Sequence, residues 1–193
     1  MNSKFTLKDI NTVANYLSLF RILLAIPIYI FLDYLHVSYH YRLILGSILI
    51  LAVITDLLDG YFARRNNEIT EIGKIIDPLA DKLCISIIII KLFLIGEISA
   101  FYFWVIILRD VIIFSGGIVV SRIIGKVLPS NRLGKITAFS IGVFILALVL
   151  GIKEYEFYYE FLLITSLVLS FASLIGYAIR AYENIRYYKN ENV

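Results

Sequence analysis

Four aspartates within one short segment are the residues of this chain best suited to chemistry. Asp56 and Asp59 lie three positions apart, and Asp77 and Asp81 lie four apart, so the members of each pair share one face of a helix. The neighbouring residues are largely apolar, and an ionised carboxylate in such surroundings is unfavourable unless it is paired or bound to a cation. The spacing therefore predicts that the two pairs converge on one charged site.

That site is expected to bind divalent cations. Clustered carboxylates repel each other, and ions that prefer oxygen ligands, such as Mg²⁺ or Mn²⁺, relieve the repulsion. Gly60 and Gly73 lie one turn from an acid and would allow a ligand to approach the backbone closely. The alternative is that the acids only pair with nearby basic residues, namely Arg64, Arg65, Lys74 and Lys82. Such pairing accounts for one or two of the acids, and not for all of them.

The elements that carry these residues are predicted to cross a membrane. Of the 193 residues, 60% are hydrophobic and 17% are charged, and the mean hydropathy of +0.86 is too high for a soluble domain of this size. Apolar runs recur along the chain, and each is close to the roughly 20 residues that cross a bilayer as a helix. Six spans are predicted, over residues 16–35, 41–63, 74–95, 100–121, 134–152 and 157–179.

The predicted fold is an all-α membrane protein, a bundle of six transmembrane helices in a single membrane domain over residues 1–193. Residues 1–14 place apolar positions at helical spacing opposite charged ones, which predicts a short amphipathic helix at the membrane surface. A plain helical extension is the alternative. The bundle covers residues 16–179, and residues 180–193 form a cytoplasmic tail.

The distribution of charge predicts the orientation. The net charge is only +3, but the basic residues gather on the side shared by both termini and the loops after the second and fourth spans. By the positive-inside rule, both termini and the aspartate segment face the cytoplasm. His36 and His40 fall on the opposite side, and no role is predicted for them. The basic residues form no continuous stripe, which argues against a nucleic-acid partner.

The aspartates belong to a longer pattern, DxxDGxxAR followed after eight residues by GxxxDxxxD. This pattern resembles the signature of the CDP-alcohol phosphotransferases, and the six-span layout also fits that family. Every position of the signature is matched, by Asp56, Asp59, Gly60, Ala63, Arg64, Gly73, Asp77 and Asp81.

The resemblance implies a site for a CDP-linked lipid. It implies that Asp56, Asp59 and Asp77 bind two metal ions that bridge the donor pyrophosphate. Asp81 resembles the family's general base and completes the metal-binding set. The CDP moiety is expected to contact Asn15, Ser18, Gly60, Ala63, Arg64 and Gly73.

Asn15, Ser18 and Arg21 form an element of the first span that resembles the corresponding element of the family, although Thr is usual at the Ser18 position. Their spacing of three places them on one face, which could approach the nucleotide. The alternative is a capped helix whose Arg21 extends its charge to the membrane surface.

Arg109, Arg132 and Lys135 are predicted to bind an anionic acceptor. Residues 127–137 resemble the loop and helix start that follow the fourth span in phosphatidylglycerophosphate synthases and cardiolipin synthases. The alternatives are an ion pair between Arg109 and Asp110 inside the bundle, and ordinary positive-inside charges for the other two residues. Asp110 departs from the Glu that is common in synthases acting on glycerol 3-phosphate, so its role and the acceptor stay open.

The leading prediction is an enzyme that transfers a phosphatidyl group from CDP-diacylglycerol to glycerol 3-phosphate, releasing CMP and forming phosphatidylglycerol phosphate. A cardiolipin synthase that uses phosphatidylglycerol as acceptor, or another CDP-alcohol phosphotransferase, is the alternative within the family. A cation transporter is the alternative outside it, but its acids are expected near the bilayer midplane on broken helices. The predicted location is a bacterial cytoplasmic membrane, and the resemblance implies a homodimer.

Overall fold

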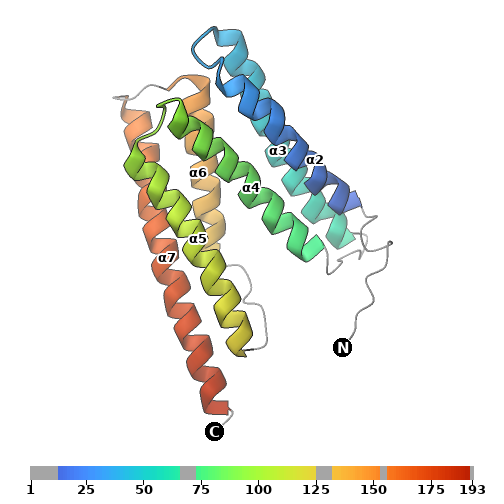
Figure 1. The fold of residues 1–193 in the computed structure, drawn as a ribbon, viewed down its shortest axis with the longest axis vertical. Helices are drawn as coiled ribbons and strands as arrows, with labels where there is room; N and C mark the ends of the chain where they lie inside the picture. The colour runs from blue at the N-terminus through green and yellow to red at the C-terminus, as the bar shows by residue number, and fades with distance from the viewer. Residues whose placement is uncertain (1–12, 66–72, 125–131, 153–155, 192–193) are drawn as a thin grey trace. The chain divides into compact units, whose positions relative to one another are not determined.

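The computed structural model describes residues 13–65, 73–124, 132–152 and 156–191. Within these ranges only the backbone is described for residues 13–15, 57, 59–65, 73–81, 189 and 191. All regular structure in the described part is α-helical, in α2 (Val13–Leu32), α3 (Tyr39–Arg65), α4 (Gly73–Leu94), α5 (Ala100–Ile124), α6 (Arg132–Leu150) and α7 (Phe157–Glu191) (Figure 1).

The six helices coincide with the six predicted spans. Their ends differ from the predicted ends by at most three residues, except that α7 continues to Glu191 through the stretch predicted as a tail. The predicted amphipathic helix over residues 1–14 falls almost entirely outside the described residues.

Four of the described helices contain apolar stretches long enough to cross a membrane, over Tyr39–Asp56, Ala100–Ile124, Arg132–Leu150 and Phe157–Tyr188. The described apolar stretch of α2, Tyr16–Leu32, is shorter. Many large apolar side chains point away from the protein, including Phe139 at 72% exposed, and such surfaces suit lipid chains. The chain is therefore an integral membrane protein, while the count of six spans stays a prediction.

Glycine ends two of the helices in the same way. Gly96 after α4 has φ 80° and Gly151 after α6 has φ 103°, a left-handed region that other residues disfavour. In both caps the next amide donates back five positions, from Glu97 to the Leu92 oxygen at 2.9 Å and from Ile152 to the Ala147 oxygen at 3.1 Å. These bonds satisfy carbonyls that the helix end would otherwise leave unpaired.

The helices form two compact units, Met1–Glu97 and Ile98–Val193. In the first unit, α2 packs against both α3 and α4. The buried apolar side chains of this unit include Ala25, Ile28, Leu32, Leu45, Leu49, Ile88, Ile89 and Leu92. The start of α2, the end of α3 and the start of α4 lie at the same end of the unit (Figure 1).

Polar contacts join α2 to α4 at the other end of the first unit. The Lys91 ammonium is buried, lies 2.6 Å from Asp33 Oδ1, and sits 4.3 Å from the centroid of the Tyr29 ring. His36, which follows Asp33 closely in the sequence, pairs with Glu97, which follows Lys91. Because an unpaired ammonium is costly away from water, Asp33 allows Lys91 to face the interior.

In the second unit, α7 packs against both α5 and α6. Tyr102 of α5, Phe144 of α6 and Tyr159 of α7 join the helices, with ring centroids 4.9 Å apart for Tyr102 and Phe144 and 5.3 Å apart for Phe144 and Tyr159. Closer to its C-terminal end, α5 approaches α7 at Gly116, where an added Cβ would lie 3.0 Å from the Tyr177 ring. The single membrane domain expected over residues 1–193 stays a prediction.

Candidate functional site

Asp56 is the only one of the four predicted aspartates whose side chain is described. It lies towards the end of α3, is 47% exposed, and its Oδ1 is 2.9 Å from a terminal nitrogen of Arg21 on α2. The Arg21 side chain is only 4% exposed. Arg21 therefore does not extend its charge to the membrane surface, as the alternative interpretation supposed, but pairs with the first acid of the signature.

Arg21 also fixes α2 relative to α4. Its backbone oxygen accepts a hydrogen bond from the Cys84 thiol at 3.2 Å. Ser18, one turn earlier on α2, is fully buried, so Ser18 and Arg21 occupy the same inward face. Asn15 begins that face, although its side chain is outside the described set. The element predicted to approach the nucleotide thus lies beside the helix that carries Asp56.

The remaining residues of the signature are placed by their backbones alone. Asp59, Gly60, Ala63 and Arg64 lie in the last two turns of α3, and Gly73, Asp77 and Asp81 lie in the first turns of α4. These helix ends lie at the same end of the first unit (Figure 1). Among side chains that are described, no three His, Cys, Asp or Glu residues form a possible metal site, and three of the predicted ligands lie outside that set.

The chemistry of Asp56 fits a divalent cation. A carboxylate has two oxygens, so Asp56 can form its ion pair with Arg21 through Oδ1 and still offer its other oxygen to a metal ion. Its half-exposed position leaves room for such an ion at the end of α3. An all-carboxylate donor set at this end would suit Mg²⁺ or Mn²⁺.

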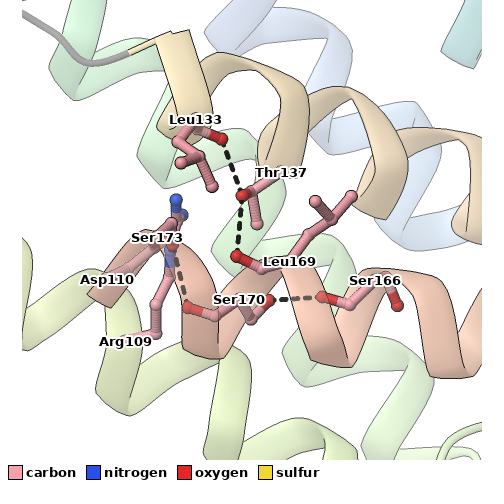
Figure 2. Close-up of polar contacts among 8 residues, drawn as sticks. All are labelled: Arg109, Asp110, Leu133, Thr137, Ser166, Leu169, Ser170 and Ser173. Carbon is pink, nitrogen blue, oxygen red and sulfur yellow. Dashed lines mark hydrogen bonds and ion pairs between the residues drawn. The ribbon is translucent and has the colours of Figure 1, made fainter. Parts of the chain in front are cut away.

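A second polar centre surrounds Arg109 in the second unit (Figure 2). Arg109 is 7% exposed, its Nε donates to Ser173 Oγ at 3.0 Å, and a terminal nitrogen lies 2.5 Å from Asp110 Oδ1. The ion pair that was the alternative interpretation of Arg109 is therefore present. It does not exclude binding, because a guanidinium has five N–H donors and these contacts engage only two nitrogens.

The start of α6 lies against Arg109. A Cβ added at Gly134 would be 3.8 Å from the second terminal nitrogen of Arg109. Arg132 and Lys135, on either side of Gly134 in the first turn of α6, are both exposed. The structure thus brings the segment that carries Arg132 and Lys135 to Arg109, while the side chains of those two residues face outward from the unit.

A line of hydroxyl groups runs along α7 beside this centre, and of these Ser173 contacts Arg109. Ser166, Ser170 and Ser173 are buried and follow one face of the helix, and Ser166 Oγ also reaches the Tyr102 hydroxyl at 3.1 Å. Thr137 of α6 lies 2.8 Å from the Leu133 oxygen and 3.1 Å from the Leu169 oxygen, which ties the first turn of α6 to α7 (Figure 2).

Sequence reasoning missed these serines. Their spacing of four and three residues was visible and predicts a shared helical face, but serine hydroxyls in membrane helices often bond only to their own backbone. Ser170 does so, donating to the Ser166 oxygen at 2.7 Å. Ser173 differs because it also accepts from Arg109.

A known protein family matches most of this chain. The family model described as CDP-alcohol phosphatidyltransferase matches residues 11–173, a range that contains every predicted site residue. Members of that family generally depend on divalent metal ions.

Several curated relatives are named CDP-diacylglycerol–glycerol-3-phosphate 3-phosphatidyltransferase. The chain is 34% identical to the Mycoplasma pneumoniae protein over 63% of its own length and 60% of that protein, less than two thirds of the relative. It is 36% identical to the Rickettsia typhi protein over 72% of the chain and 76% of the relative. It is 33% identical to the Aquifex aeolicus protein over 90% of the chain and 97% of the relative.

Proposed function

Because the chain belongs to the CDP-alcohol phosphatidyltransferase family, we propose that it transfers a phosphatidyl group from CDP-diacylglycerol to glycerol 3-phosphate. The products are CMP and phosphatidylglycerol phosphate. The family match over residues 11–173, which includes the complete aspartate signature, is the observation that carries the proposal. The choice of acceptor is supported by the names of the relatives and by the cationic residues near Arg109.

The aspartates account for the donor side of the reaction. The acceptor hydroxyl oxygen forms a bond to the β-phosphorus of the donor, the bond to the CMP oxygen breaks, and Asp81 takes the hydroxyl proton. Metal ions held by Asp56, Asp59, Asp77 and Asp81 would neutralise the pyrophosphate charge during this step. Asn15, Ser18, Gly60, Ala63, Arg64 and Gly73 are proposed to contact the CDP moiety.

Arg21 has a supporting role in this scheme. It holds Oδ1 of Asp56 at 2.9 Å and is itself buried, so its position is set by the packing of α2. An acid fixed in this way keeps one orientation, which favours a preformed ligand site over a mobile carboxylate.

The acceptor side depends on charge at the start of α6. Arg109 is balanced by Asp110, so the pair adds hydrogen-bond donors but little net charge. Arg132 and Lys135 supply the net positive charge, and the N-terminal end of α6 favours an anion as well. A phosphate monoester is the acceptor group that uses all of these contacts.

The proposed orientation places both termini and the catalytic end of the first unit at the cytoplasmic face of a bacterial cytoplasmic membrane. The basic residues of the loops after the second and fourth spans support it. A homodimer is proposed from the family resemblance alone.

The test is release of CMP from CDP-diacylglycerol by the purified protein in detergent, with each candidate acceptor added in turn. We expect release with glycerol 3-phosphate and little with serine, inositol phosphate or phosphatidylglycerol. Asp77→Asn protein, purified alongside, controls for contaminating activity. Release that required phosphatidylglycerol instead would refute the acceptor and identify a cardiolipin synthase.

A further inference from the structure

We propose that Gly134 and Ser173 together determine how this protein binds the phosphate of its acceptor, Gly134 by leaving one edge of Arg109 uncovered and Ser173 by aiming that edge. The inference rests on the proposed function, since it concerns the acceptor site. It assigns roles to two uncharged residues that the pattern of charges does not single out.

Two contacts fix the orientation of the Arg109 guanidinium. Its Nε donates to Ser173 Oγ at 3.0 Å, and one terminal nitrogen contacts Asp110 Oδ1 at 2.5 Å. A guanidinium is planar and rigid, so fixing two of its three nitrogens fixes the direction of the third. The remaining nitrogen therefore presents its N–H donors to one defined place.

The start of α6 lies in front of this third nitrogen. The third nitrogen faces Gly134 in the first turn of α6, 3.8 Å from the position a Cβ would occupy. That Cβ would meet no other described atom within 4 Å beyond its own helix. An alanine methyl group would thus fit without a clash, yet it would occupy the space from which a phosphate oxygen could approach these donors.

Ser173 aims the arginine through its hydroxyl oxygen. The Ser173 hydroxyl donates to the Ser170 oxygen at 2.9 Å, which leaves its lone pairs to accept from Arg109 Nε. Ser173 is 2% exposed, so water cannot replace it readily. Ser173 is a positioning residue, because its effect on the acceptor passes through Arg109.

The experiment uses two matched pairs in the full-length protein. Gly134→Ala is compared with Gly142→Ala on the same helix, where an added Cβ meets nothing within 4 Å. Ser173→Ala is compared with Ser170→Ala, another buried serine of α7 whose hydroxyl bonds only its own helix in the described structure. The KM values for glycerol 3-phosphate and for CDP-diacylglycerol are measured for each variant, with thermal unfolding as a check on folding.

We expect Gly134→Ala and Ser173→Ala to raise the KM for glycerol 3-phosphate about tenfold, the effect of losing one charge-assisted hydrogen bond, with the donor KM unchanged. Gly142→Ala and Ser170→Ala should stay within about twofold of wild type. Alanine is a better helix former than glycine, so a loss in Gly134→Ala would not reflect a weaker helix.

Two failures can be told apart. If wild type releases CMP with glycerol 3-phosphate but Gly134→Ala and Ser173→Ala match their controls, the roles of Gly134 and Ser173 are overturned and the proposed function stands. If wild type itself shows no release that depends on glycerol 3-phosphate, the proposed acceptor is wrong and the inference falls with it. A rise in the KM values for both glycerol 3-phosphate and CDP-diacylglycerol in the two variants would also overturn it. So would unfolding of Ser173→Ala together with unchanged KM values in Gly134→Ala.

Discussion

The pair between Arg21 and Asp56 gives an asymmetric prediction for stability. The Arg21 side chain is 4% exposed and the Asp56 side chain is 47% exposed. Asp56→Asn removes the charge that balances a buried arginine, whereas Arg21→Met leaves behind a carboxylate that solvent can reach. The first substitution should therefore be the more damaging one, although both break the same contact.

The magnitude follows from that burial. Removing one partner of a fully buried ion pair costs about 3 to 5 kcal/mol, but the exposure of Asp56 screens this pair, so we take about 2 kcal/mol for Asp56→Asn. For Arg21→Met we take about 0 to 1 kcal/mol, since methionine refills most of the apolar volume. At about 2 to 4 °C per kcal/mol for a chain of this length, the apparent Tm should fall by about 4 to 8 °C in Asp56→Asn.

The assay is thermal unfolding in one detergent at one heating rate, in metal-free buffer so that a bound ion does not add to the difference. The double variant Arg21→Met with Asp56→Asn should unfold at a higher temperature than Asp56→Asn alone, because it no longer contains the buried guanidinium that Asp56 balances. Equal Tm values for the two single variants, or a lower value for Arg21→Met, would refute the reasoning that burial of Arg21 sets the cost.

Three further predictions concern the site and the orientation. Treatment with EDTA should abolish CMP release, Mg²⁺ or Mn²⁺ should restore it, and Asp77→Asn should stay inactive at any metal concentration; full activity after EDTA would exclude the metal site. Arg132→Ala and Lys135→Ala should each raise the KM for glycerol 3-phosphate about three- to tenfold and leave the donor KM unchanged, because both residues are exposed and partly screened; unchanged KM values would make them topology signals only. In a Cys84→Ala background, Asn67→Cys should react with a membrane-impermeant thiol reagent only from the cytoplasmic side and Val37→Cys, at an exposed position, only from outside; the reverse labelling would invert the topology.

The helices could be predicted closely from the sequence because bilayer thickness dictates their length. Five of the six differ from the predicted spans by at most three residues at either end. The exception, α7, continues to Glu191 because the polar residues after the span have good helix propensity and no Pro or Gly follows Gly176. Apolar length predicts where a helix can cross a membrane, but it does not predict how far the helix extends beyond it.

The partners of the charged residues could not be predicted in the same way. The sequence offered nearby basic residues for the aspartates, yet Asp56 pairs with Arg21, which lies on another helix. Arg109 pairs with its neighbour Asp110, as their spacing allows, and also donates to Ser173. The contact with Ser173 depends on how α5 and α7 are rotated against each other. Convergence of Asp59, Asp77 and Asp81 with Asp56 stays a prediction, supported by the position of the end of α3 and the start of α4 at the same end of the first unit.

The two buried arginines follow a common rule that connects packing to function. In each pair the arginine is the more buried partner, with side chains 4% and 47% exposed for Arg21 and Asp56 and 8% and 20% exposed for Arg109 and Asp110. A guanidinium can be buried at lower cost than an ammonium because its charge is delocalised and weakly hydrated. The arginine then acts as a fixed interior anchor, and the group that it orients faces the polar side. In the first unit that group is the Asp56 carboxylate, whereas in the second unit Arg109 is itself oriented by Asp110 and Ser173. Under the proposed function, the first of these groups suits a cation and the second an anion, each within its own unit.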